Sequence, residues 1–221
     1  MPEGPSIVIL KEEVQHFAGD KIISVSGNSK IDQSRLQNQR VTSFKSWGKH
    51  FLICFEGFTV RVHFLLFGTY RINETRDLPV RLNLKFKNGD LNLYSCSIKI
   101  LEGDINKHYN WTEDVMNENW NPKNAKRKLR EEPNKLVCDA LLEQHIFSGV
   151  GNIIENEILY RVYVHPESLI GQIPEAKINE IIEQARIYSF EFLTWKKKKM
   201  NSGNTGFHTH RKIVFDVICL S

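Results

Sequence analysis

The first apolar pattern in the chain has the spacing of a helix. Its apolar positions recur at intervals of three and four residues: Ile7, Leu10, Val14 and Phe17. Side chains with this spacing share one face of an α-helix, and Gly19 follows where glycine is favoured, just beyond a helix end. We therefore expect an amphipathic helix over residues 6–18, which would fix the position of the residues before it.

From Lys21 to about Ile100 the pattern alternates over short stretches. Alternation with a period of two is typical of strands that bury one face, and Glu56-Gly57 and Asn88-Gly89 are hairpin signals between them. The sequence predicts an antiparallel β-sandwich over about residues 1–120, flanked by the N-terminal helix. The expected strands are 22–26, 41–44, 51–55, 59–64, 69–72, 82–86, 91–94 and 98–101.

Helical spacing returns after an Asn-rich break that contains Pro122. Two apolar stripes precede Pro166, and a last long helix is expected from Pro174, since proline suits the first helical turn. The predicted fold class is therefore α+β. We expect a β-sandwich domain over residues 1–120, a helical domain over residues 121–200 and a short terminal segment over residues 201–221.

Composition and charge narrow the class of protein. The 221 residues are 41% hydrophobic, enough for a buried core, and the net charge of +4 permits a nucleic-acid partner without requiring one. The sequence has no apolar run of about 18 residues and no basic-then-apolar leader, so neither a membrane span nor a secretory signal is indicated. We expect a cytoplasmic location, associated with the nucleoid if the source is bacterial.

The cysteines give no metal-binding pattern. They are scattered, without a Cys-x-x-Cys pair: Cys54, Cys96, Cys138 and Cys219. Zinc fingers and ribbons need closely spaced ligand pairs, and His208 and His210 with a single distant cysteine offer three donors at best. We expect no metal and no cofactor.

Pro2 and Glu3 are candidate catalytic residues. If Met1 is removed, as a small following residue permits, the chain starts with a secondary amine beside a carboxylate. An α-amino group has a pKa of about 7.7–8.0, so part of it is unprotonated and nucleophilic at neutral pH. Such an amine can condense with C1′ of an abasic sugar, and the resulting iminium promotes elimination of the 3′ phosphate. A turn-rich terminus without chemistry is the alternative interpretation.

The turn Gly149-Val150-Gly151-Asn152 lies between two helical stripes. Amide groups at a helix N-terminus bind anions and Asn152 can add a side-chain donor, so this turn suits a DNA phosphate; an ordinary turn is the alternative. The basic segment before it includes Lys126 and Arg127. That segment is either a solvated helix face or a surface that attracts phosphate.

Three blocks occur in a fixed order along the chain: PEGP at residues 2–5, SWGKHF at 46–51 with VHFLLFGTYR at 62–71, and LLEQHIFSGVGNIIENEIL at 141–159. Together they resemble the formamidopyrimidine-DNA glycosylase and endonuclease VIII family of base-excision repair enzymes, and PEGP is closer to the endonuclease VIII branch. The resemblance implies a DNA glycosylase with abasic-site lyase activity. Its partner would be double-stranded DNA with an oxidised base, pyrimidines being expected, or an abasic site, and the protein would act as a monomer.

The same resemblance implies roles for single residues. Pro2 would be the Schiff-base nucleophile, Glu3 the acid that helps open the sugar, and Lys49 the hairpin lysine that contacts phosphate and assists proton transfer. Asn152, with Gly151 in a helix-two-turns-helix motif, would bind phosphate beside the lesion.

The strand that follows the hairpin contributes further candidates. His63, a strand histidine among aromatic residues, either packs in the core or contacts DNA. One of the three residues Leu65, Leu66 and Phe67 would fill the gap left by the flipped base, and the sequence does not distinguish them.

Two departures from the family pattern bear on activity. The second glutamate of Pro-Glu-x-Pro-Glu is Ser6, so proton transfer at the sugar would be slower or would rely on Glu155, Glu157 or water. The terminal segment holds one cysteine where the family's zinc finger needs four, and Arg211 is the nearest candidate for the finger's arginine. We expect a truncated or lost finger, reduced DNA affinity, and β-elimination that survives better than δ-elimination. The alternative function is a catalytically impaired DNA-damage-binding protein of the same fold.

Overall fold

The structure is a computed structural model that describes residues 2–201. The chain begins with α1 (Gly4–Glu13), which has Pro5 in its first turn and continues into a short 3-10 helix, η1 (Gln15–Phe17). Gly19 follows with a φ of 89°, a left-handed conformation that glycine adopts without strain. The expected N-terminal helix is thus present, but it starts directly after Glu3 and its last turn is a 3-10 helix. The expectations for His208, His210, Arg211 and Cys219 lie outside the described residues.

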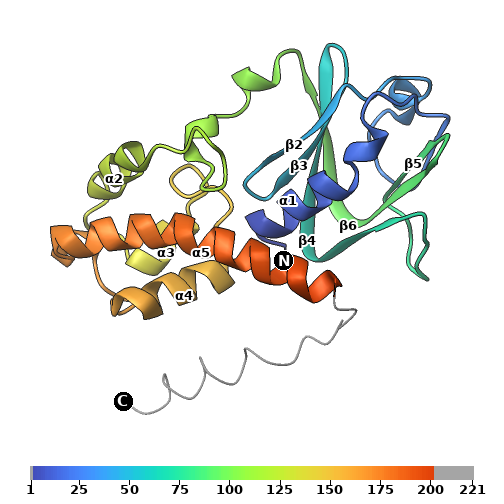
Figure 1. Cartoon of the computed structure of the whole chain (residues 1–221). Coiled ribbons are helices and arrows are strands. Elements are labelled where there is room, and N and C mark those ends of the chain that lie inside the picture. Colours follow the sequence, from blue (N-terminus) through green and yellow to red (C-terminus); the bar gives the residue numbers. More distant parts are fainter. Residues whose placement is uncertain (1, 202–221) are drawn as a thin grey trace.

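Six strands form an antiparallel sheet in the order β1-β5-β6-β4-β3-β2 (Figure 1). Their bounds are β1 (Ser24–Ser26), β2 (Ser43–Trp47), β3 (His50–Cys54), β4 (Phe58–Ile72), β5 (Leu82–Phe86) and β6 (Gly89–Glu102). The expected stretches 59–64 and 69–72 are parts of the one strand β4, and 91–94 and 98–101 are parts of β6.

A register shift between Phe64 and Thr69 of β4 divides this sheet into two halves. Before the shift, β4 pairs with β3. Beyond the shift, β4 pairs with the first residues of β6; these residues also pair with β5, and β5 pairs with β1. Side chains from both halves, such as Phe51 and Leu84, belong to the same buried apolar cluster. The antiparallel β architecture expected for the N-terminal part is confirmed.

The second part of the chain is helical and has an apolar cluster of its own. Its helices are α2 (Pro122–Arg130), α3 (Val137–Leu142), α4 (Asn152–Val162) and α5 (Glu175–Asn201), with short 3-10 helices η2 (Gln33–Leu36), η3 (Ile105–Lys107), η4 (Trp111–Glu113) and η5 (Ile170–Gln172) elsewhere in the chain. The α+β fold class is confirmed, whereas the domain boundary at residue 120 stays a prediction. Within residues 2–201, no helix is both long and apolar enough to cross a membrane.

The two parts meet at the start of the chain. Figure 1 shows α5 running along the helical part and ending close to the N-terminus. Its Lys197 forms an ion pair with Glu12 of α1 at 2.5 Å. The N-terminal residues therefore lie where the sheet and the helices come together.

Candidate active site

The carboxylate of Glu3 is bound by the first turn of α4, 150 residues further along the chain. Its Oε1 accepts a hydrogen bond from the amide of Ile153 at 2.8 Å, and Oε2 accepts one from the amide of Ile154 at 3.3 Å. The amide of Gly4 donates to the carbonyl of Gly149 at 2.9 Å. The unpaired amides at a helix N-terminus favour an anion, so they hold Glu3, and with it Pro2, at the junction of the two parts.

Gly151 allows this close approach. A Cβ on Gly151 would lie 2.6 Å from Cδ and Oε1 of Glu3. This distance is shorter than a normal van der Waals contact, so a side chain at this position would displace the Glu3 carboxyl. Two amides of the helix N-terminus that follows this turn, those of Ile153 and Ile154, are thus used by Glu3. Asn152 remains exposed at the start of α4 and is the part of this turn that a phosphate can reach.

Lys49 is the second charged group of this site. Both residues are almost fully buried, Glu3 being 5% and Lys49 7% exposed. Burial raises the pKa of Glu3, and the Ile153 and Ile154 amides and the charge of Lys49 oppose that shift. Burial lowers the pKa of Lys49, and the charge of Glu3 opposes that shift. Shifts of these signs bring an acid and an amine closer to neutral pH, which suits groups that exchange protons.

The turn between β2 and β3 positions Lys49. Gly48 has a φ of 51°, and its amide donates to Oδ2 of Asp114 at 3.0 Å. Oδ1 of Asp114 accepts from the amide of Met116 at 2.9 Å, and burial raises the pKa of this carboxyl to about 6. Asp114 was missed at the sequence level, because its role depends on a contact with a residue 66 positions away.

Ser148 packs against the same turn. A Cβ on Gly48 would lie 1.9 Å from Oγ of Ser148, so only glycine fits between the hairpin and the loop before α4. Oγ is buried and has no hydrogen-bond partner within the described part of the chain. The turn therefore makes a van der Waals contact with Ser148 and a hydrogen bond with Asp114.

His63 lies beside Lys49, opposite His50 across β3 and β4, with the two ring centroids 5.1 Å apart. Burial lowers the pKa of both imidazoles, to about 3 for His50, and Lys49 contributes to the shift at His63. Nε2 of His63 is buried without a hydrogen-bond partner among residues 2–201. Because this nitrogen is buried, a DNA contact by His63 stays a prediction.

The bulge in β4 exposes three apolar side chains: Leu65 (52%), Leu66 (66%) and Phe67 (83%). Gly68 closes the bulge, since a Cβ there would lie 2.7 Å from Cβ of Phe64 and 2.8 Å from the carbonyl oxygen of Ser95. Exposed apolar side chains on a tightly built bulge suit insertion between stacked bases. The structure therefore presents all three wedge candidates outward.

Lys126 and Arg127 are not brought to this site. Lys126 forms an ion pair with Glu175, and Arg127 forms one with Glu131. Figure 1 shows their helix, α2, at the opposite end of the helical part from the N-terminus. Local carboxylates thus balance both charges, as on a solvated helix face.

The two glutamates considered as substitutes for the missing second carboxylate differ in their surroundings. Ser6 lies in α1, where its amide donates to the carbonyl of Glu3 at 2.9 Å. Glu157 forms an ion pair with Arg161 at 3.0 Å. Glu155 is 5% exposed, and burial together with the charge of Glu3 raises its pKa to about 7. Of these two glutamates, Glu155 is the one that interacts electrostatically with Glu3.

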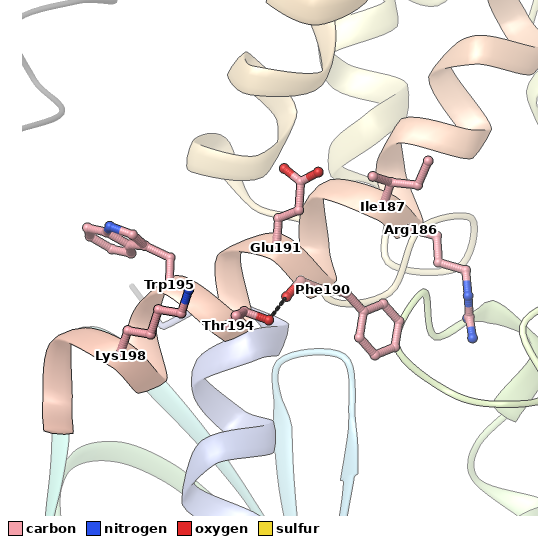
Figure 2. Close-up of a pocket in the computed structure, with 7 residues that line it drawn as sticks. All are labelled: Arg186, Ile187, Phe190, Glu191, Thr194, Trp195 and Lys198. Atoms are coloured by element: carbon pink, nitrogen blue, oxygen red, sulfur yellow. Dashed lines mark hydrogen bonds between the residues drawn. The ribbon is translucent and has the colours of Figure 1, made fainter.

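A hollow of about 630 Å³ lies apart from these residues, on α5 (Figure 2). All seven residues that line it come from this helix: Arg186, Ile187, Phe190, Glu191, Thr194, Trp195 and Lys198. Figure 2 shows Phe190 and Trp195 pointing to opposite sides, and the hydroxyl of Thr194 donating to the carbonyl of Phe190 at 2.9 Å. A surface made by one helix does not enclose a small molecule, so this hollow offers no closed site for a reaction.

Two protein-family models match the β-sheet part and the helical part of the chain separately. The formamidopyrimidine-DNA glycosylase N-terminal domain matches residues 1–96, and the formamidopyrimidine-DNA glycosylase H2TH domain matches residues 112–189. The chain belongs to the formamidopyrimidine-DNA glycosylase family. The expected helix-two-turns-helix motif is confirmed, since the H2TH match contains α2, α3 and α4.

Curated members of the formamidopyrimidine-DNA glycosylase family carry endonuclease and lyase names. Endonuclease 8-like 3 of Xenopus laevis is 25% identical over an alignment of 214 residues, which covers 91% of this chain and 34% of that protein. Endonuclease 8-like 2 of Homo sapiens is 34% identical over 136 residues, 56% of this chain and 39% of that protein. DNA-(apurinic or apyrimidinic site) lyase Nei2 of Mycolicibacterium smegmatis is 24% identical over 168 residues, 73% of this chain and 64% of that protein. The chain thus spans less than two thirds of each.

Solved structures of this glycosylase family share the fold. One is Lactococcus lactis Fpg (MutM) in complex with DNA that contains N7-benzyl-Fapy-dG. Its TM-score to this chain is 0.77 at 21% sequence identity, over 87% of this chain and 79% of that one.

Proposed function

We propose that this protein is a base-excision repair DNA glycosylase with abasic-site lyase activity, acting on oxidised bases in double-stranded DNA. One observation carries the proposal: α4 holds Glu3, the residue next to Pro2, beside the buried Lys49. An amine, an acid and a second amine are the groups that Schiff-base chemistry on a sugar requires. Pyrimidines are the expected bases, because the N-terminal block resembles the endonuclease VIII branch.

The first step removes the base. The Pro2 amine, freed by loss of Met1, attacks C1′, and the bond from C1′ to the base breaks as the base takes up a proton. The attached nitrogen then loses its proton, its lone pair forms the iminium, and the C1′–O4′ bond breaks. Glu3 donates the proton that O4′ gains, which is why a carboxyl with a raised pKa suits this position.

The second step cuts the strand. The iminium draws electrons from C2′, so a C2′ proton is lost and the C3′–O bond breaks with departure of the 3′ phosphate. Lys49 would contact phosphate and assist the proton transfers, and its lowered pKa favours the second role. We expect β-elimination to dominate over δ-elimination.

DNA binding would use the surface groups around Glu3. Asn152 would contact a phosphate, His63 is a candidate for a second DNA contact, and one of the exposed residues of the β4 bulge would occupy the gap left by the flipped base. Bringing the target base out of the stack lets the sugar reach a site as enclosed as this one. One chain supplies every group named, so a monomer suffices.

Borohydride trapping tests the proposal. Borohydride reduces an iminium to a stable amine, so an oligonucleotide with an abasic site becomes covalently attached to the protein. We expect a band from the wild type, mapped by peptide mass to Pro2, after intact mass has confirmed loss of Met1. Pro2→Gly and Glu3→Gln should reduce the band, whereas Glu12→Gln, a carboxyl-to-amide change in the helix that follows Glu3, should not.

The other outcomes are equally clear. A protein that lacks Met1, binds abasic DNA and gives no band would be the catalytically impaired damage-binding protein. A protein that binds abasic and undamaged duplex equally would contradict both functions.

A further inference from the structure

The strands beside the β4 bulge do not hold it in place. The pairs between β3 and β4 end at His63, and the pairs between β4 and β6 pass from Phe64 directly to Thr69. Among residues 2–201, no pair of this sheet therefore falls on residues 65–68. A segment that leaves the ladder of hydrogen bonds takes its direction from the residues at its two ends. The orientation of the three exposed apolar side chains thus depends on how these two ends are fixed.

The two ends are fixed in different ways. Phe64, at the first end, is 2% exposed and belongs to the apolar cluster of the sheet part. Tyr70, just beyond the second end, packs on the same cluster, with its ring centroid 6.3 Å from that of Phe64. Its hydroxyl donates a hydrogen bond to Oε2 of Glu13 at 2.5 Å. Glu13 is the last residue of α1, so a polar contact with the N-terminal helix fixes the second end.

Glu13 occupies a position where a carboxylate needs such a partner. The C-terminal end of a helix carries partial negative charge and favours cations over anions. The hydroxyl of Tyr70 offsets this with a hydrogen bond to a charged acceptor, which is stronger than one between neutral groups. Burial and this hydrogen bond raise the pKa of Tyr70, so the phenol keeps the proton that it donates.

The helix that ends at Glu13 also carries the catalytic terminus. Glu3 directly precedes α1 and is bound by the amides in the first turn of α4. The ten residues of α1 span about 15 Å, and its side chains Ile7 and Leu10 are buried in the sheet part. One packed helix, which starts at the N-terminus in Figure 1, therefore connects the residue next to Pro2 with the anchor of the bulge.

We infer that Tyr70 and Glu13 are positioning residues for base flipping: their hydrogen bond fixes the β4 bulge relative to Pro2, so that the inserted side chain enters the duplex where the flipped nucleotide reaches the amine. The inference rests on the proposed function, because it concerns how DNA approaches that site. Without the hydrogen bond the bulge can turn relative to α1, and its apolar side chains would meet the base stack in the wrong place. A single-stranded abasic site needs no inserted side chain, because it has no paired strand to leave.

Trapping rates on single-stranded and on duplex abasic oligonucleotides separate positioning from chemistry. Tyr70→Phe keeps the ring and removes the donor, and Glu13→Ala removes the acceptor. With cyanoborohydride, each should slow trapping on the duplex by about tenfold, as for a misplaced contact, and leave the rate on the single strand within about twofold. Glu13→Gln keeps an oxygen that can accept from Tyr70, so it should restore the duplex rate to near that of the wild type.

Tyr94→Phe is the control for a loss of stability. Tyr94 is fully buried in the same sheet, and its hydroxyl accepts a hydrogen bond from the amide of Arg76 at 3.1 Å. This variant should lower the free energy of unfolding comparably and leave the ratio of duplex to single-strand trapping unchanged. The double variant Tyr70→Phe/Glu13→Ala should be no slower on the duplex than either single variant, since both changes remove the same contact. A wild-type ratio in Tyr70→Phe overturns the inference while leaving the proposed function intact.

A second measurement needs no reaction. A duplex with a tetrahydrofuran analogue of the abasic site cannot form an iminium, and 2-aminopurine opposite the analogue becomes brighter when a side chain displaces it from the stack. At saturating protein, the wild type, Glu13→Gln and Tyr94→Phe should raise the fluorescence, and Tyr70→Phe and Glu13→Ala should raise it less. If the wild type forms no adduct on any DNA, the proposed function fails and this fluorescence alone decides the inference. Equal signals from all five proteins would refute it.

Discussion

The amide of Gly48 donates a hydrogen bond to Oδ2 of Asp114 at 3.0 Å, which ties the turn that carries Lys49 to the segment leading into the helical part. The other oxygen of Asp114 accepts from the amide of Met116. One buried carboxylate thus orients the hairpin lysine relative to the helices that hold Glu3. The geometry between Lys49 and Glu3 depends on a residue with no chemical role of its own.

Asp114→Asn should therefore weaken both stability and trapping. The asparagine oxygen replaces one acceptor, but its NH₂ group faces the second amide, which leaves a buried donor unpaired at a cost of about 1–3 kcal/mol. Urea unfolding should show this loss, and the trapping rate should fall because Lys49 shifts. Asp104→Asn, at the exposed cap of η3, is the control and should change the free energy of unfolding far less. Equal effects at the two positions would show that the Gly48 contact does not matter.

Gly151→Ala tests the contact between Glu3 and α4 directly. Gly151 is not in a left-handed conformation, so alanine introduces no backbone strain; its Cβ would instead occupy the space of the Glu3 carboxyl, 2.6 Å from Cδ. We expect trapping to fall by at least about tenfold, as for a displaced catalytic group. Binding of undamaged duplex should be retained, since Asn152 stays exposed. Wild-type trapping in this variant would mean that the position of Glu3 is not important.

Local patterns predicted a large part of the fold. The helix after Pro2, the strand 82–86 and the long helix after Pro174 follow from periodicity and from proline and glycine positions. The stretches 59–64 and 69–72 looked like two strands, because the exposed residues 65–67 interrupt the alternation while the backbone continues through a bulge.

The candidate site was only partly predictable, and for a different reason. Pro2, Glu3 and Lys49 came from motifs, and the structure brings Glu3 and Lys49 together. Asp114 has no such signal, because its role follows from burial and from a contact between segments far apart in the chain. Glu155 was named only as one of several substitutes for the missing second glutamate, and its burial is visible only in the structure. For Lys126 and Arg127 the sequence could not show the carboxylates of Glu175 and Glu131 that pair with them in the fold, and their role in DNA binding stays a prediction.

The exposed bulge gives a prediction that separates binding from stability. Leu65, Leu66 and Phe67 are more than half exposed, so changing each to serine should alter the free energy of unfolding by less than about 0.5 kcal/mol. The residue that fills the gap in the duplex should, when changed, weaken binding of abasic DNA while leaving undamaged duplex unaffected. Fluorescence anisotropy with both DNAs measures the difference. Three variants with unchanged preference for abasic DNA would remove the bulge from the binding mechanism.

Glu155 also makes a prediction about stability and pH, independent of any activity. Its pKa is about 7 in the folded chain against 4.5 for an ordinary glutamate. Below the lower value both the folded and the unfolded chain bind the proton, so the ionisation of Glu155 does not affect the free energy of unfolding. Between the two values the unfolded chain has released the proton and the folded chain has not, so stability falls as the pH rises. Above the higher value the full cost remains, about 3 kcal/mol for a shift of this size.

Glu155→Gln should consequently be more stable than the wild type by up to about 3 kcal/mol at pH 8, and the gain should shrink towards zero near pH 4.5. The other titrating groups, including Asp114, are common to both proteins and cancel in the difference. Urea unfolding at several pH values measures it. Glu157→Gln loses an ion pair whose side chains are 30% and 28% exposed, and should show a small loss of stability without this slope. A difference between Glu155→Gln and wild type that does not change with pH would show that Glu155 ionises in the folded protein as it does in water.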